Sequence, residues 1–202
     1  MAPKIVDKEM RRLEIATAAS ILFGRYGFDK VKIDDVAKAA GIGKGTVYEY
    51  FKNKDELING AFEMLIGHIM QEISATVDLT LKPLDALEKL TFSMATALDH
   101  VGDQYGFFLE YVLMLSRGGG NTDIMTDMLI EYRGLVAGLL EAAVDAGQVR
   151  QNVDIAHTAG AYAAWFDGAI FHWMTIKSPD LQSLTIAFWD FFVAGITPRE
   201  VE

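Results

Sequence analysis

The spacing of hydrophobic residues near the amino end predicts two helices that each bury one face. Between residues 15 and 26 apolar side chains recur every three or four positions, and Gly27 follows where a helix often ends in the left-handed conformation. In the next run Val36, Ala37 and Ala40 share one face, while the charged residues around them remain in water. We expect the longer helix to cover the apolar face of the shorter one.

A sharp turn and a third short helix follow. Gly41 stands where a left-handed residue ends the second helix, and Ile42 is placed to make the hydrophobic contact that commonly follows it. A helix from about Lys44 to Phe51 then directs Val47 and Phe51 toward the core. Its first turn lies where a recognition helix meets base edges in the major groove. The pattern is typical of a helix-turn-helix that reads DNA.

The remainder of the chain predicts six longer helices, and no segment alternates in the manner of a strand. Their expected ranges are about 54–76, 83–101, 104–117, 122–147, 154–177 and 180–195. The predicted fold is therefore all-α with about nine helices. A three-helix helix-turn-helix domain at residues 1–52 precedes a six-helix ligand-binding and dimerisation domain at residues 53–202.

Turn-forming residues mark the ends of these helices. Asn53, with a glutamate three positions later, resembles a capping box, and Pro83 fits a first helical position. Gly102 is expected to end a helix, and residues 117–122 to form a mobile connector. Residues 178–180, Ser-Pro-Asp, are expected to serve as N-cap, N1 and N2 of the last helix.

The charge distribution agrees with a nucleic-acid-binding amino end. Residues 1–60 contain 11 lysines and arginines against 9 acidic residues, a net of +2, whereas residues 61–202 carry a net of −12. The overall charge of −10 therefore does not argue against DNA binding. Lys4, Lys8, Arg11 and Arg12 are expected to form a basic arm ahead of the first helix, either tracking a groove or solvated.

Several classes of protein are excluded by what the chain lacks. There is no cysteine, hence no disulfide or thiolate metal site, and the four histidines show no metal-ligand spacing. The sequence also lacks the GxSxG motif that carries a nucleophilic serine and the glycine-rich motif that binds dinucleotides. We expect no catalysis, metal or cofactor. The apolar stretches at 161–176 and 186–196 are too short and too charged to span a membrane, and no signal peptide is recognised, so a cytoplasmic location is expected.

Residues 13–57 closely resemble the DNA-binding domain of the TetR (tetracycline-repressor-like) family of regulators. The resemblance is carried by the strings IATAASILFGRYGF, VAKAAGIGKGTVYEYF and KNKDEL in this order. It implies that bases or the adjoining backbone are contacted by Lys44, Gly45, Thr46 and Tyr50. It also implies that Tyr48 and Lys54 contact phosphates.

Three positions depart from the family pattern. Val31, Lys32 and Ile33 replace a common threonine cap, so the cap is missing or supplied otherwise, and Gly43 replaces a frequent serine in the turn. Glu49 adds a carboxylate to the recognition helix. It either accepts a hydrogen bond from a cytosine amino group, repels wrong sequences, or is simply solvated.

The resemblance also implies an internal ligand pocket among the central helices. The residues predicted to contact ligand are Met64, His68, Phe92, His100, Phe108, Tyr111, Met128, Tyr132, Trp165 and Phe166. Methionine and aromatic side chains suit a small hydrophobic or aromatic effector, although for any single one of them core packing is the better explanation. Asp167 and Glu110 are candidates for recognising a cationic effector. The alternative is exposure on a helix flank or a salt bridge to Arg133 or Arg117.

The last two helices are expected to form a homodimer interface. A stripe of small residues runs along the first of them, and the second is rich in aromatic residues. The predicted interface residues are Gly160, Ala164, Gly168, Phe188, Trp189 and Phe192. The family resemblance implies a four-helix bundle made by two subunits, although the stripe also suits packing within one subunit. A twofold dimer then presents two recognition helices to a pseudo-palindromic operator.

The function expected from the sequence is a DNA-binding, ligand-responsive transcriptional regulator, usually a repressor, that a small and largely apolar molecule releases from its operator. Two other classes stay open. One is an all-helical small-molecule-binding protein with weakened or lost DNA binding. The other is an adaptor that uses its aromatic last helix to bind a foreign protein.

Overall fold

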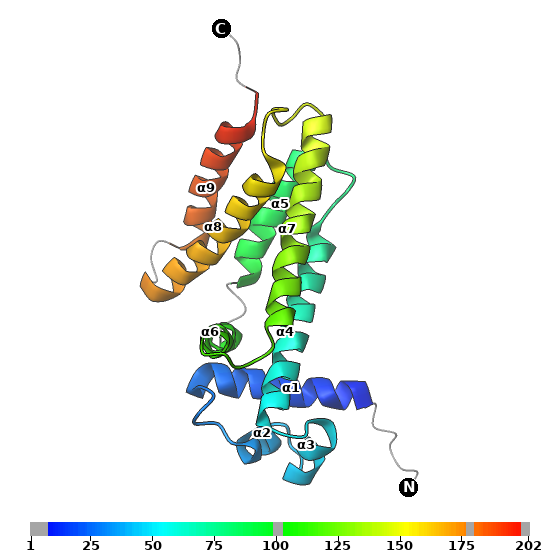
Figure 1. The fold of residues 1–202 in the computed structure, drawn as a ribbon, viewed down its shortest axis with the longest axis vertical. Helices are drawn as coiled ribbons and strands as arrows, with labels where there is room; N and C mark the ends of the chain where they lie inside the picture. The colour runs from blue at the N-terminus through cyan, green and yellow to red at the C-terminus, as the bar shows by residue number, and fades with distance from the viewer. Residues whose placement is uncertain (1–7, 99–102, 177–179, 199–202) are drawn as a thin grey trace. The chain divides into compact units, whose positions relative to one another are not determined.

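The computed structural model describes residues 8–98, 103–176 and 180–198, which form α-helices and connecting turns without a strand (Figure 1). The helices are α1 (Lys8–Tyr26), α2 (Ile33–Ala39), α3 (Lys44–Tyr50), α4 (Lys54–Thr76), α5 (Pro83–Leu98), α6 (Asp103–Ser116), α7 (Thr122–Asp145), α8 (Ile155–Ile176) and α9 (Leu181–Ile196). The predicted all-α fold is confirmed. Gly102, the expected end of a helix, lies outside the described residues.

The chain divides into two compact units. One contains residues 1–69 and 101–125, and the other contains residues 70–100 and 126–202. The first unit therefore holds α1, α2, α3, α6 and the beginning of α4. The second unit holds α5, α8, α9, the end of α4 and most of α7.

In the first unit α6 packs closely against α1. The two helices meet at glycines, because a Cβ atom added to Gly106 would overlap the carbonyl oxygen of Gly24. Aromatic rings fill the space beside this crossing. Phe23 stacks on Phe107 with ring centroids 6.1 Å apart, and Phe28 meets both rings edge-on. The aromatic contacts hold α6 firmly against the amino-terminal helices.

The side chain of Tyr111 connects the turn after α6 to α4 through ring stacking and hydrogen bonds. Its ring stacks on Phe62 at 3.6 Å, and its hydroxyl donates to Asn59 Oδ1 at 2.7 Å. The same hydroxyl oxygen accepts from the Asn121 N–H at 3.0 Å. Gly118 adds a left-handed helix end with φ +81°. The connector predicted at residues 117–122 is present, and these hydrogen bonds and the helix-ending glycine define its path, while its mobility stays a prediction.

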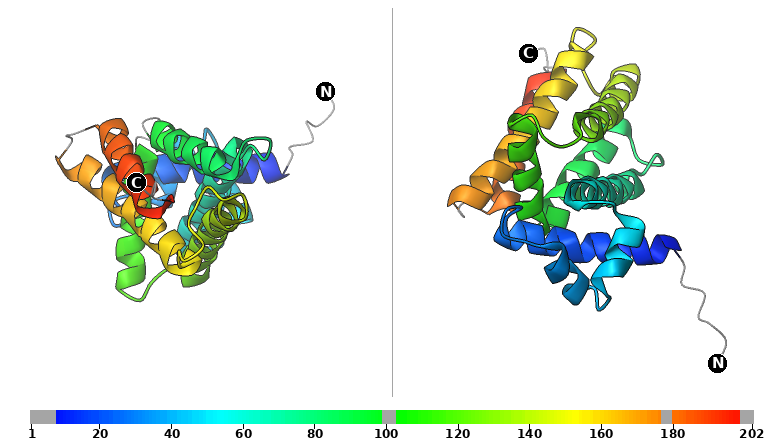
Figure 2. Two further views of the ribbon diagram at one scale, coloured as in Figure 1. Left: turned by 90° about the horizontal axis from the view of Figure 1, so that it is seen from above. Right: turned by 60° about the horizontal axis from the view of Figure 1, so that its bottom comes forward.

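The second unit has an aromatic core between α7, α8 and α9. Tyr162 is fully buried, and the rings of Phe188 and Phe192 pack edge-on against it. Trp165 stacks on Phe188 with centroids 3.7 Å apart. Helices α8 and α9 lie side by side in both views (Figures 1 and 2), and α5 contacts α9 from another direction.

The amino end of α9 differs from the prediction. Asp180 is the N-cap, and its side chain accepts from the Ser183 N–H at 2.8 Å. The sequence favoured Ser178 as N-cap, with the proline and aspartate inside the helix, which is wrong by two positions. A carboxylate is an equally good cap that also favours the positive end of the helix dipole. Ser178 itself lies outside the described residues.

Candidate DNA-binding surface and effector residues

The turn between α2 and α3 has the geometry that the glycine pattern predicts. Gly41 has φ +67°, its N–H donates to Lys38 O at 3.1 Å, and the Ile42 N–H donates to Ala37 O at 3.0 Å. This is a Schellman motif, which satisfies carbonyls at the end of α2. The threonine cap missing at the start of α2 is partly replaced, because the Asp35 carboxylate accepts from the Lys32 N–H at 2.9 Å.

One side of helix α3 is buried in the protein core, and its other sides are exposed to solvent. Val47 on α3 and Phe51 at its end are fully buried. The predicted DNA-contact residues on this helix are exposed or half-buried: Lys44, Gly45, Thr46, Tyr48, Glu49 and Tyr50. Gly43 is the N-cap and gives no side-chain hydrogen bond, so the first turn of α3 keeps backbone N–H groups without a side-chain cap. A helix start of this kind suits a phosphate.

Lys44 has a protein partner on the neighbouring helix. Its ammonium lies 3.0 Å from Asp34 Oδ2, and this hydrogen bond raises the pKa of Lys44. The two side chains are 52% and 48% exposed. Because an exposed ion pair is weak, a DNA phosphate or base can compete for Lys44.

The basic residues at the amino end are folded into α1. Lys8, Arg11 and Arg12 belong to this helix, so the expectation that they form an arm ahead of it is wrong, while Lys4 lies outside the described residues. Arg11 pairs with Glu14 at 2.5 Å. The guanidinium of Arg12 lies 4.9 Å from the centroid of the Phe51 ring. Arg12 therefore packs against the helix-turn-helix, whereas Arg11 pairs within α1.

The start of α4 confirms the predicted cap at Asn53. Asn53 Oδ1 accepts from the Glu56 N–H at 2.8 Å, and the Glu56 carboxylate accepts from the Lys52 N–H at 2.9 Å. The ammonium of Lys54 donates to the carbonyl oxygen of Phe28 and lies 5.9 Å from the centroid of the Phe23 ring. A phosphate contact from Lys54 would require this hydrogen bond to open.

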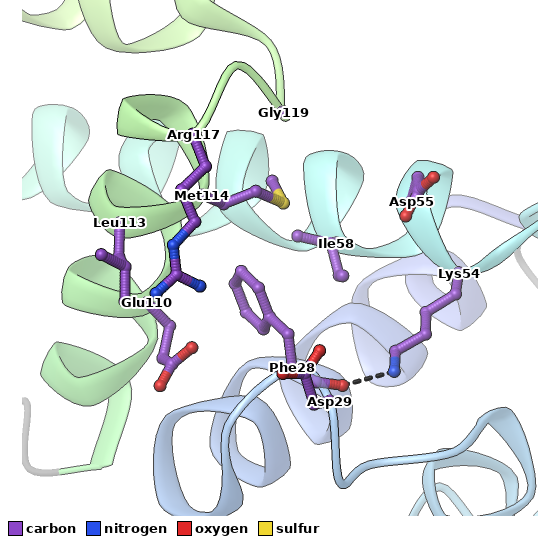
Figure 3. Close-up of a pocket in the computed structure, with 10 residues that line it drawn as sticks. All are labelled: Phe28, Asp29, Lys54, Asp55, Ile58, Glu110, Leu113, Met114, Arg117 and Gly119. Atoms are coloured by element: carbon purple, nitrogen blue, oxygen red, sulfur yellow. Dashed lines mark hydrogen bonds between the residues drawn. The ribbon is translucent and has the colours of Figure 1, made fainter.

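A cavity of about 310 Å³ lies next to Lys54 within the first unit (Figure 3). Its walls come from the turn after α1, the start of α4, and α6 with the turn that follows it: Phe28, Asp29, Lys54, Asp55, Ile58, Glu110, Leu113, Met114, Arg117 and Gly119. Glu110 thus faces a cavity, as a ligand-recognising group would. In the described part of the chain neither Glu110 nor Arg117 forms an ion pair, so the predicted alternative of a salt bridge between them is not observed.

The predicted effector residues fall into two sets. Met64, His68, Phe108 and Tyr111 belong to the first unit, and Phe92, Met128, Tyr132, Trp165 and Phe166 belong to the second. His100 lies outside the described residues. Tyr111 already uses its hydroxyl within the protein, and the side chain of Tyr132 is only 7% exposed and lies beside the ring of Tyr162. Asp167 lies at the surface, where partial desolvation raises the pKa of its carboxyl group.

The residues predicted for the dimer interface differ in accessibility. Ala164 and Gly168 are exposed, and a Cβ at Gly168 would meet open space. Gly160 instead packs against the Arg133 guanidinium of the same chain, and Trp189 is buried within the subunit. Four exposed apolar side chains on α8 and α9 were not among the predicted interface residues: Phe171, Ile176, Ile186 and Phe191. Helical periodicity counted from the small-residue stripe would have placed Phe171 on the same face.

Comparison with known proteins shows to which family this helix-turn-helix belongs. Residues 15–61 match the family model described as "Bacterial regulatory proteins, tetR family". The chain belongs to the TetR family. It is accordingly a ligand-responsive, DNA-binding transcriptional regulator and not an enzyme, and the regulators of this family bind operator DNA, act as dimers and respond to small molecules.

One relative spans nearly the whole chain, and another spans about three quarters of it. The fatty acid metabolism regulator protein of Bacillus subtilis (strain 168) is 22% identical over 194 residues, covering 94% of this chain and 97% of that protein. The HTH-type transcriptional repressor KstR2 of Rhodococcus jostii (strain RHA1) is 28% identical over 152 residues, covering 73% of this chain and 72% of that protein.

A solved structure has the same fold. The crystal structure of the transcriptional regulator FadR from Bacillus subtilis in complex with stearoyl-CoA has a TM-score of 0.74 and 21% identity, covering 91% of this chain and 98% of that chain. In the described ranges of the TetR-family chain, no helix is long and apolar enough to cross a membrane, and no group of histidine and carboxylate side chains is arranged to hold a metal ion.

Proposed function

We propose that this protein is a dimeric repressor that binds a pseudo-palindromic operator and leaves it when a largely apolar effector binds. The observation that carries the proposal is the orientation of α3. Val47 and Phe51 fix one side in the core, and the polar residues between them face outward. A short helix held in this way is suited to enter the major groove.

The proposed DNA contacts follow from exposure and charge. Lys44, Gly45, Thr46 and Tyr50 contact bases or the adjoining backbone, Tyr48 contacts a phosphate, and Glu49 discriminates among sequences. Lys54 contacts a phosphate only after releasing Phe28. We add Lys38 and Lys52, which are exposed on either side of the turn and of α3, and whose ammonium groups are not paired with any described residue.

The proposed effector is hydrophobic and binds among the methionine and aromatic residues predicted from the sequence. Two relatives support this class by their names, since one is a fatty acid metabolism regulator and another was solved with stearoyl-CoA. The proposed effector can also carry a positive charge. The carboxylate of Glu110 would then bind it, because Glu110 faces the cavity and has no ionic partner among the described residues.

Helix α4 is proposed to transmit the signal. It is one continuous helix that begins at the Asn53 cap beside α3 and contributes residues to both units. The proposal has two states of the protein, one able to bind DNA and one released from it, which differ in the position of α4. An effector that binds one of these states more tightly shifts the equilibrium toward that state. The cytoplasmic location expected from the sequence belongs to the same proposal.

The experiment is a salt-titrated binding assay on the DNA that flanks the coding region of this protein. We expect a footprint with twofold symmetry and an affinity that falls steeply as salt rises. Tyr48→Phe should weaken binding to all sequences, whereas Thr46→Ala should also relax the sequence preference. Thr76→Val, at the far end of α4, is the control. Absence of any protected site at low salt would refute the proposal.

A second candidate is a small-molecule-binding protein whose DNA binding is weakened. It is favoured by two observations: Gly43 gives α3 no side-chain cap, and both Lys44 and Lys54 have partners within the protein. Effector binding without sequence-specific DNA binding would support this alternative.

A further inference from the structure

The cavity beside Lys54 has charges of both signs along one face of α6. Glu110 and Arg117 line it, and the apolar side chain of Met114 lies between them. Positions 110, 114 and 117 share a helix face because they are four and seven residues apart. Arg117 follows the last residue of α6, and its N–H donates to Met114 O at 3.1 Å, so the backbone continues to turn there. Figure 3 shows the three side chains projecting toward the Phe28 ring.

These two charges have no partner in the ranges that the structure describes. The carboxylate of Glu110 is half-buried and the guanidinium of Arg117 is exposed, and neither forms a hydrogen bond or an ion pair with a described residue. Lys54, by contrast, already donates to the carbonyl oxygen of Phe28. Glu110 and Arg117 can therefore each bind a ligand group of opposite charge.

The position of the Glu110 carboxylate favours a positive ligand group. A Cβ atom added to Gly27 would lie 3.3 Å from Glu110 Oε1, so this carboxylate rests against the left-handed glycine that follows α1. The carboxyl end of a helix carries a partial negative charge, which a nearby positive charge stabilises. Glu110 adds a full negative charge at the same place. An ammonium group bound here would offset both.

The other charged walls disfavour both a simple cation and a simple anion. A cation would meet Arg117 and Lys54, and an anion would meet Asp29 and Asp55 in addition to Glu110. Like charges repel each other, and this repulsion reduces the gain from any single ion pair. A zwitterion avoids the conflict, because its positive group can lie beside Glu110 and its negative group beside Arg117.

The apolar walls and the size of the cavity define the rest of the ligand. Phe28, Ile58 and Met114 supply an apolar surface. The volume of about 310 Å³ is at the lower end of the range for small-molecule sites, with room for about ten non-hydrogen atoms. An amino acid with a hydrocarbon side chain has this size.

We propose that the cavity binds an amino acid with an apolar side chain, whose ammonium group pairs with Glu110 and whose carboxylate pairs with Arg117. The side chain of the ligand packs on Phe28. The inference rests on the proposed function in taking Glu110 as the group that binds positive charge, and it adds the negative group of the ligand and its partner Arg117. The site lies wholly within the first unit.

Calorimetry on the full chain tests the proposal with matched probes. L-leucine is compared with 3-methylbutylamine, which lacks the carboxylate, and with 4-methylpentanoate, which lacks the ammonium group. L-phenylalanine is compared in the same way with 2-phenylethylamine and 3-phenylpropanoate. We expect at least one amino acid to bind about tenfold more tightly than its amine and its carboxylate, because each of these loses one charge-assisted contact.

Two variants assign the contacts. In Arg117→Gln the amino acid should bind about tenfold more weakly and no more tightly than its amine. In Glu110→Gln it should bind about tenfold more weakly and no more tightly than its carboxylate. Asp123→Asn is the control, because Asp123 is an exposed acid of the same unit that does not line the cavity. It should bind the amino acid as the parent does, and circular dichroism checks that all three variants keep their helix content.

Three results would overturn the proposal: neither amino acid binds, an amine or a carboxylate binds as tightly as its amino acid, or both cavity variants bind the amino acid as the parent does. An amine that binds as tightly as the amino acid would leave a cationic effector in place and remove only the zwitterion. The proposed function is judged separately, because operator binding of the ligand-free protein is measured without any of these probes.

Discussion

Two glycines of the helix-turn-helix have opposite roles. Gly41 has φ +67°, a conformation that an L side chain adopts only with strain, although open space surrounds it. Gly45 has ordinary helical geometry within α3, and a Cβ there would also meet open space. The two glycines therefore differ in backbone conformation and not in the space around them.

Gly41→Ala should destabilise the protein by about 1 kcal/mol, because alanine disfavours a left-handed conformation. Gly45→Ala should stabilise it by about 0.5 to 1 kcal/mol, because alanine is the better helix former. Urea unfolding of the two variants measures both effects. An unchanged midpoint for Gly41→Ala would contradict the prediction.

Gly45→Ala should also weaken operator binding, in contrast to its effect on stability. The added methyl group lies on the exposed side of α3, where DNA is proposed to approach. Fluorescence anisotropy with the operator measures the loss. If the variant is more stable and binds DNA as well as the parent, then Gly45 does not lie against the DNA.

The conformation of single residues at helix ends could be predicted from the sequence. The hydrogen-bond partners of buried polar side chains could not. Gly27 and Gly41 are left-handed as predicted, because helix ends depend on residues close in sequence. Tyr132 was selected as an aromatic lining residue. The hydrogen bond that its neighbour Tyr162 forms with Thr91 became evident only in three dimensions, because these two residues lie on different helices.

At the scale of helices, the Tyr111 hydroxyl connects α6, α4 and the turn that leads to α7. Its partners lie 52 positions earlier and 10 positions later in the chain. Helix boundaries follow from local periodicity and were predicted closely. The hydroxyl contact between distant segments could not be predicted, and for this reason the turn after α6 was expected to be mobile.

Tyr111→Phe should lower the free energy of unfolding by about 1 to 2 kcal/mol, because Asn59 and Asn121 lose their shared partner. Tyr26→Phe, at a position that is largely exposed, is the control and should have little effect. Thermal and urea unfolding measure both. Equal stability of the two variants would show that water replaces the Tyr111 hydroxyl without cost.

At the scale of the whole molecule, α8 and α9 expose both small and large apolar residues, which we take together as the candidate dimer surface. It contains Ala164, Gly168, Phe171, Ile186 and Phe191. The sequence located this surface through its small residues, but it selected Trp189, which is buried within the subunit, in place of Phe191, which is 81% exposed. Periodicity alone did not show which side of α9 faces the subunit core.

Phe191→Asp should abolish dimerisation while leaving the fold of the subunit intact, because the side chain makes little contact within its own chain. Analytical ultracentrifugation measures the mass, and circular dichroism measures the helix content. Ile130→Asp places the same charge at another exposed apolar position, on α7, and should leave the dimer unchanged. A Phe191→Asp variant that remains dimeric would exclude this surface as the interface.

The meeting of α1 and α6 at Gly24 and Gly106 has a mechanical consequence. With no side chains between the two backbones, there is no soft layer in which a small displacement of α6 is absorbed by a change of rotamer. A shift of α6 is therefore passed on to α1 nearly undiminished. We therefore expect this glycine crossing to couple the position of α6 to that of α1.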